Sequence, residues 1–289
     1  MSIASILTAA LALTTVGAPH QDARLRVVVS LPPQVWLVES IGGPRVEVAA
    51  LVGPGESEET YSPTDAQVSA ALRASVFFRI GASFEQAPWF RALDAAERLE
   101  IADTRDGVDL ITMDGSGPYT ERGTSGPTLD PHLWTSPRRL AIQARTVAAT
   151  LTRLDPSGRG LYERRLGEVT RELEALDREL AGMLESYRGR AFFVFHPTWG
   201  YLATDYGLRQ IAVETEGKEP TDRDLTRLLE LARVERPRVL LVEPQVPSNV
   251  AEAVAGAIGA TVVRHDSLAA DPPANLRSVA RSLVEAFAP

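Results

Sequence analysis

Two histidines and two carboxylates lie where strand-like runs end or a turn-rich loop begins. His196 ends the run AFFVFH, Asp266 follows ATVVRH, His132 lies in LDPHLW and Glu59 lies in GPGESEETYSP. Open α/β sheets bind ligands at the carboxyl ends of their strands, so these side chains are candidates for a site. Two imidazoles and two carboxylates form a complete tetrahedral set for zinc, and their oxygen share also suits manganese.

Each of these residues also has a purely structural interpretation. His132 could hydrogen-bond within its proline-bounded loop, and His196 could be a histidine with an ordinary partner at a strand end. Asp266 could cap a helix, and Glu59 lies among other glutamates that favour an exposed acidic loop. The four are far apart in sequence and form no local metal signature such as HExxH, so spacing alone leaves both interpretations open.

The elements that must position these residues follow a βαβ rhythm. Short β-branched runs alternate with helical patterns on both sides of Leu161–Tyr187, where leucine and valine recur every three or four residues among charges. This pattern predicts an α/β fold with two βαβ lobes, each containing a parallel sheet, joined by one long linker helix. The Gly/Ser/Pro/Thr-rich stretch Asp114–Pro127 predicts an exposed loop. The expected divisions are an N-terminal lobe at 24–157, the linker helix at 158–188 and a C-terminal lobe at 189–289.

Composition narrows the possible functions. The 289 residues carry a formal net charge of -8 with a pI near 5.2, which argues against nucleic acid as a partner. There is no cysteine, so disulfides and thiolate metal ligands are excluded. The uncharged run at 3–16, followed by small residues, predicts a signal peptide at 1–18 and an extracytoplasmic, periplasmic protein. An uncleaved leader that anchors the chain in a membrane is the alternative.

Five ordered blocks of the sequence resemble the zinc- and manganese-binding solute-binding proteins of ABC importers. The blocks cover nearly all of the chain after the predicted leader. They are SLPPQVWLVESIGGPRVEVAALVGPG, TYSPTDAQVSAALRASVFFRIGASFE, DPHLWTSP, HPTWGYLATDYGL and VEPQVPSN. The resemblance implies two α/β lobes with a metal ion in the cleft between them, and a metal-binding monomer that delivers its ion to an ABC permease.

Carried over residue by residue, the family's metal ligands fall on Glu59, His132, His196 and Asp266. The family usually has a histidine just before Thr-Tyr-x-Pro, whereas this chain has Glu59 there. The exchange of an imidazole for a carboxylate shifts preference from Zn²⁺ towards Mn²⁺ or Fe²⁺, while the general affinity order still favours Zn²⁺ over Mn²⁺. Many zinc receptors also carry a histidine-rich tract in the loop at 114–127, and this chain has none. Glu214, Glu216 and Glu219 are interpreted as surface charge.

The resemblance predicts a receptor and not an enzyme, with the loops of Glu59 and Asp266 closing over the ion. A secreted metal-dependent hydrolase is one alternative, in which Glu59 would serve as general base beside a zinc ion that keeps an open position for water. A metal-free adhesin or scaffold on the same fold is the other. Stabilisation by added metal separates the receptor from the scaffold.

Overall fold

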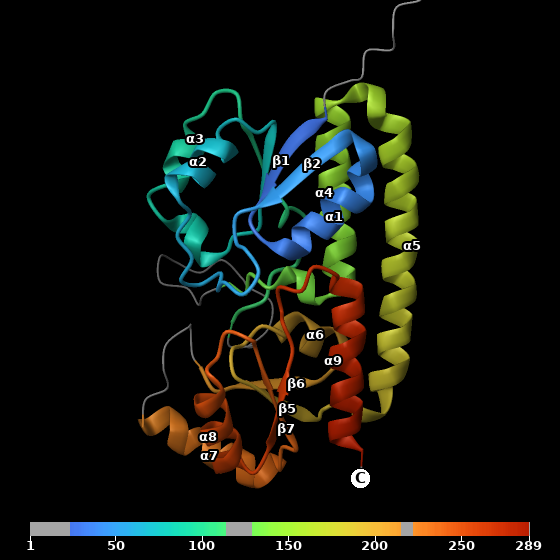
Figure 1. Ribbon diagram of the computed structural model, residues 1–289. Coiled ribbons are helices and arrows are strands. Elements are labelled where there is room, and N and C mark those ends of the chain that lie inside the picture. Colours follow the sequence, from blue (N-terminus) through green and yellow to red (C-terminus); the bar gives the residue numbers. More distant parts are fainter. Residues whose placement is uncertain (1–23, 114–128, 215–221, 289) are drawn as a thin grey trace, which may run out of the picture.

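The computed structural model describes residues 24–113, 129–214 and 222–288. The predicted signal peptide at 1–18, the whole predicted loop at 114–127, and Glu216 and Glu219 lie outside the described residues. Two lobes are stacked along one long helix (Figure 1). Within the described residues, no helix is both long and apolar enough to cross a membrane.

The first lobe is built on a four-stranded parallel sheet in the order β2-β1-β3-β4. Its central strands are apolar on both faces, as expected of a parallel sheet that helices cover. The strands are β1 (Leu25–Val29), β2 (Val46–Ala50), β3 (Val76–Arg79) and β4 (Glu100–Asp103). The helices are α1 (Pro32–Gly42), α2 (Asp65–Ala71) and α3 (Phe90–Asp94), with short 3₁₀ turns η1 (Gly43–Arg45) and η2 (Ser83–Gln86).

Two antiparallel helices follow this lobe. The turn η3 (Leu133–Thr135) leads into α4 (Pro137–Leu154), which begins at the N-cap Ser136, whose hydroxyl accepts from the amide of Arg139. After a short turn, η4 (Pro156–Gly158), helix α5 (Arg159–Leu184) runs for 26 residues and ends in η5 (Glu185–Tyr187). The predicted long helix is therefore present.

The second lobe repeats the architecture with a parallel sheet in the order β6-β5-β7-β8. Its strands are β5 (Ala191–Val194), β6 (Arg209–Ala212), β7 (Val239–Val242) and β8 (Thr261–Arg264). Its helices are α6 (Gly200–Tyr206), α7 (Asp222–Glu235), α8 (Ser248–Ile258) and α9 (Pro272–Phe287). The α/β fold with two parallel sheets and a long helix, predicted from the sequence, is confirmed.

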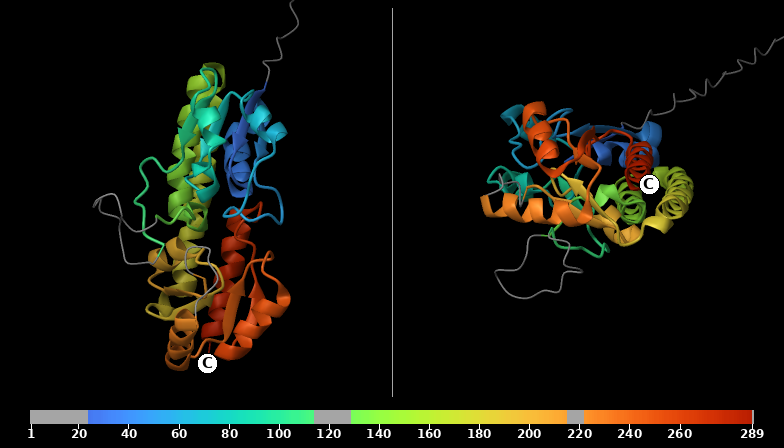
Figure 2. Two further views of the ribbon diagram at one scale, coloured as in Figure 1. Left: turned by 90° about the vertical axis from the view of Figure 1, so that its left-hand side faces the viewer. Right: turned by 90° about the horizontal axis from the view of Figure 1, so that it is seen from below.

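Helix α5 is part of the core and not an isolated connector. Its stripe of Val169, Leu173, Leu176 and Leu180 is buried, in one continuous apolar cluster with the first sheet, α4 and α9. Helix α9 runs beside α5, as both views of Figure 2 show. A smaller cluster fills the other face of the second sheet, under α7 and α8. Burial of each such aliphatic side chain contributes about 1.5–3 kcal/mol, so relative movement of whole lobes would be opposed along this side.

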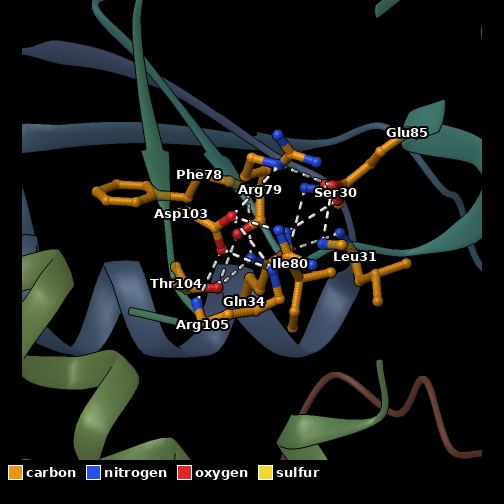
Figure 3. A network of polar contacts seen from close by, with 11 residues as sticks. Ser30, Leu31, Gln34, Phe78, Arg79, Ile80, Glu85, Asp103, Thr104 and Arg105 are labelled. Carbon is orange, nitrogen blue, oxygen red and sulfur yellow. Dashed lines mark hydrogen bonds and ion pairs between the residues drawn. The ribbon is translucent and has the colours of Figure 1, made fainter. Parts of the chain in front are cut away.

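The buried carboxylate of Glu85 joins the carboxyl ends of β1 and β3, the two central strands of the first sheet. Glu85 accepts hydrogen bonds from the Ser30 hydroxyl at 2.5 Å and the Ile80 amide at 2.9 Å, which joins η2 to the ends of β1 and β3 (Figure 3). Ser83, in the same turn, lies 3.5 Å from the carbonyl oxygen of Glu58. The network therefore provides a rigid base for the loop after β2.

Candidate metal centre

Strand register places a row of ionisable residues at the carboxyl edge of the second sheet. Val194 of β5 pairs with Ala212 of β6 and with Leu241 of β7. Continued by two residues, this register brings His196 between Glu214 and Glu243. Parallel strands bring their carboxyl ends to the same edge, so residues distant in sequence meet there.

The first lobe contributes the loop after β2. Glu58 is buried and Glu59 is half-buried. The loop is fixed at its base because the Tyr61 hydroxyl donates to the Leu51 carbonyl oxygen at 2.6 Å. Gly55, with a φ of 80°, allows a turn that side-chain-bearing residues rarely adopt. Two adjacent glutamates are thus held over the edge of the second sheet.

His132 lies between the lobes and is held by Asp130. One carboxylate oxygen of Asp130 accepts from the backbone amide of His132 at 2.9 Å and contacts its Nδ1 at 2.7 Å. Gly200 permits this arrangement, since a Cβ there would lie 2.5 Å from Asp130 Oδ2. Both residues belong to sequence blocks on which the family resemblance rests.

Two imidazoles and two carboxylates face one another. Nε2 of His132 lies 3.5 Å from Oε1 of Glu58, and Nε2 of His196 lies 3.3 Å from Oε1 of Glu59. The two rings are 5.4 Å apart between centroids. Glu58, His132 and His196 each place a ligand atom within 4.8 Å of the others, and Glu59, His196 and Glu214 form a second such group.

Three of the atoms that face one another in the site have no hydrogen-bond partner. Glu58 Oε1, His132 Nε2 and His196 Nε2 are buried and accept or donate no hydrogen bond. Buried polar atoms are nearly always paired, so three that converge on one point need an explanation. A cation that all three can ligate supplies one.

The opposite nitrogen of each histidine is bound to a carboxylate. Asp130 contacts Nδ1 of His132, and Glu214 Oε2 lies 3.1 Å from Nδ1 of His196. Such a carboxylate holds the proton on Nδ1, leaves the Nε2 lone pair for a metal and raises its basicity. Both rings therefore have the orientation that metal-binding histidines adopt.

Burial is the largest single influence on the pKa values of Glu58, Glu59 and His132. Burial opposes the charge on His132, but Asp130 and Glu58 outweigh it and raise its pKa to about 10. Burial raises the pKa of Glu59, an effect that His196 and His132 partly offset. Burial also raises the pKa of Glu58, but the nearby His132 outweighs burial and leaves that pKa lowered overall.

Asp266 lies near this cluster but belongs to neither three-residue group. Its Oδ1 accepts from the Leu268 amide at 2.9 Å, and its carbonyl oxygen accepts from the Asn275 side chain at 2.8 Å. Burial, and to a lesser extent the charge of Glu58, raises its pKa, which places it within electrostatic reach of that carboxylate. The alternative that Asp266 caps a helix is wrong, because the N-cap of α9 is Asp271; Asp266 instead accepts from the backbone of a turn that precedes that helix.

The structure brings Glu59, His132 and His196 together and adds residues that the sequence interpretation missed. The interpretation of Glu214 as surface charge is wrong, because it is half-buried against His196. The exposed acidic loop expected around Glu59 is also wrong, since Glu58 is buried against His132. An available signal was that strand-like runs of the second half end in ionisable residues: AFFVFH, RQIAVE, RVLLVE and ATVVRH.

The lobes contact each other differently on the two sides of the site. On one side the buried Tyr201 hydroxyl donates to the carbonyl oxygen of Asp130 at 2.9 Å and accepts from the Ile111 amide. On the other side Gln245 Nε2 donates to the carbonyl oxygen of Glu56 at 3.2 Å in an exposed position. Opening is expected on the exposed side, where the cross-lobe contact competes with water.

Comparisons with known proteins cover nearly the whole chain. The family described as ZnuA, zinc-uptake complex component A, periplasmic, matches residues 27–288. A putative metal-binding protein of Treponema pallidum is 27% identical over 252 residues, with 84% of this chain and 79% of that protein covered. The iron ABC transporter substrate-binding lipoprotein MtsA of Streptococcus pyogenes is 25% identical, with 80% and 76% covered. A ZnuA deletion mutant solved with zinc bound is 37% identical, with a TM-score of 0.82 over 92% of this chain and 99% of that one.

Proposed function

Because this chain belongs to the ZnuA family of periplasmic metal-uptake proteins, and so is the metal-binding receptor component of an ABC importer, we propose that its ion binds between the lobes at Glu59, His132 and His196. Glu58 and Asp266 are proposed to complete the set. The family is a transport component and not an enzyme. Export through residues 1–18, delivery to a membrane permease and action as a monomer belong to the same proposal.

The convergence of three buried atoms that lack partners carries this proposal. Nε2 of His132, Nε2 of His196 and Oε1 of Glu58 would each gain a bond from one cation. The cation would also relieve the repulsion between neighbouring carboxylates that a neutral ligand leaves in place.

Asp266 is proposed to bind the ion in the fully closed form. Its Oδ1 holds the Leu268 amide in the present conformation, so one carboxylate oxygen must rotate towards Glu58. A carboxylate can serve as both turn acceptor and metal ligand through its two oxygens. Asp266 would then be the easiest ligand to withdraw when the ion is released.

Zn²⁺ is proposed as the cargo, with Mn²⁺ and Fe²⁺ as the alternatives. Two imidazole nitrogens with carboxylate oxygens suit all three ions, and the affinity order favours Zn²⁺. The relatives name two of these three ions, since one is described as zinc-bound and another as an iron transporter component. The chain's departure at Glu59 adds oxygen character and makes this choice an experimental one.

Capture and release follow from the unequal contacts between the lobes. The buried side at Tyr201 keeps His132 and His196 at a fixed separation. The loop with Glu58 and Glu59 can move on the exposed side after the bond from Gln245 to Glu56 breaks. We propose that the permease promotes this local movement, which removes carboxylates from the ion while the histidines stay in place.

The test is thermal unfolding of the metal-free chain with Zn²⁺, Mn²⁺, Fe²⁺ and Mg²⁺. A ligand at 100 times its dissociation constant stabilises the folded state by about 2.7 kcal/mol. For a chain of this size that raises the midpoint by roughly 4–5 °C. The same series is run on His196→Ala and Glu59→Ala, with Glu252→Ala on the exposed surface of α8 as the matched control.

We expect a transition metal to raise the midpoint of the parent and of Glu252→Ala, and to lose most of this effect in the two site variants. The ion with the largest effect identifies the cargo. If no ion raises the midpoint of the parent, the proposal fails and the metal-free scaffold takes its place. Equal gains in all four proteins would put the ion at another site.

A further inference from the structure

Glu243 is a buried carboxylate beside the candidate metal centre that matches none of the ligand positions carried over from the family. It follows β7 directly, and strand register brings it next to His196. Only 7% of the residue is exposed. Thr198 donates its hydroxyl to Oε1 at 3.0 Å, while Oε2 is buried and has no hydrogen-bond partner.

Two ionisable residues of the site act on Glu243, although its carboxylate belongs to neither of the three-residue groups. The charge of His196 favours the ionised form of Glu243, and the charge of Glu58 in the opposite lobe opposes it. Arg264 donates to the backbone carbonyl oxygen of Glu243 and not to its side chain. The side chain therefore has no salt-bridge partner among the described residues.

Such a group is costly for a folded protein unless a cation can reach it. A buried carboxylate with an unpaired oxygen loses its hydration without a full replacement. Burial raises the pKa of Glu243 to about 7. Thr198 fixes one oxygen and so leaves the other available. One carboxylate oxygen of Glu243 thus has a hydrogen-bond partner, and the other has none and can bind a cation.

We propose that Glu243 is a further ligand of the bound ion and supplies an oxygen atom through Oε2. Compared with a site that has the same two histidines but lacks this carboxylate, the site would then bind Mn²⁺ or Fe²⁺ more tightly relative to Zn²⁺. This inference rests on the proposed function, because it places Glu243 at the same ion. Zn²⁺ prefers about four ligands and gains little from more, whereas harder ions such as Mn²⁺ accept about six and prefer oxygen. An additional carboxylate therefore stabilises Mn²⁺ more than Zn²⁺.

The experiment measures dissociation constants of Mn²⁺ and Zn²⁺ for the parent, Glu243→Gln and Glu243→Asp, by competition with a chelating indicator. Glu243→Gln keeps size and removes charge. Glu243→Asp keeps charge and draws the carboxylate back by one methylene, so it separates direct ligation from the field of a nearby charge. Glu252→Gln on α8 is the control for a carboxylate outside the site. Unfolding of each metal-free variant verifies that it is folded.

We expect Mn²⁺ to bind about 10- to 100-fold more weakly to both Glu243 variants, with a smaller change for Zn²⁺, since partners around a metal site commonly contribute this much. Visible absorption of Co²⁺-loaded protein supplies a direct readout: the parent should have the weak bands of a five- or six-coordinate ion, and Glu243→Gln the stronger bands of a four-coordinate one.

The inference is overturned if the ratio of the two dissociation constants is the same in parent and Glu243→Gln, or if Glu243→Asp behaves as the parent does. These results leave the proposed function standing, because the parent still binds metal. A parent that binds neither ion would instead overturn the proposed function, and this inference with it.

Discussion

Replacement of Asp130 by asparagine tests whether the site is a metal centre with oriented histidines. Asp130 is 1% exposed, and one of its oxygens holds both the backbone amide and Nδ1 of His132. Asparagine retains the volume and an acceptor but loses the charge. His132 would keep its place, while its Nε2 would become a weaker donor to a metal.

The expected size of the effect follows from the role of such partners. Loss of a carboxylate behind a metal-binding histidine weakens affinity about 10- to 100-fold, which is about 1.4–2.7 kcal/mol. At saturating metal, the loss reduces the metal-dependent rise of the unfolding midpoint by roughly 2–5 °C for a chain of this size.

The assay compares unfolding midpoints with and without the preferred metal for the parent, Asp130→Asn and Asp205→Asn. Asp205 is the matched control because its side chain is only 3% exposed and bonds to Ser136 and Arg139 between the lobes, away from both histidines. Both variants should unfold at lower temperature without metal, and only Asp130→Asn should lose part of the gain from metal. A full metal gain in Asp130→Asn would refute the reasoning.

One further change tests the buried contact between the lobes, and another tests an ion pair at the turn between α4 and α5. Tyr201→Phe leaves the Ile111 amide and the Asp130 carbonyl oxygen without their buried partner, so chemical denaturation should give a metal-free stability lower by about 1–3 kcal/mol; an unchanged stability would mean that the hydroxyl contributes nothing there. Asp155, bonded to the Arg45 guanidinium, has its pKa lowered mainly by that bond, so its stabilisation is present above its unfolded pKa of about 3.9 and is lost as pH falls towards the lower folded value. The stability difference between the parent and Asp155→Asn should therefore shrink on acidification below about pH 4, and a difference that stays constant with pH would contradict this assignment.

Short sequence patterns predicted the helices and strands because each of these elements depends mainly on residues that are close together in the sequence. The leucine and valine spacing of α5 sets an apolar stripe wherever the helix packs, and buried parallel strands need continuous apolar runs. The same reasoning predicted His196, since a polar residue at the end of such a strand lies at the ligand-binding edge. His132 and Glu59 became convincing only through the family resemblance, because no strand precedes them directly.

The sequence by itself determined the two parallel sheets, the long helix and the chemical types available for a metal. Only the tertiary structure decided which carboxylates join the histidines. Glu58 and Glu59 are adjacent and chemically identical, yet one faces His132 and the other His196 because of how their loop is fixed on η2. Glu214 and Glu243 flank His196 through strand register, which pairs residues 18 and 47 positions away from it. Contacts of that range depend on how chain segments pack and not on local propensity, so no local pattern specifies them.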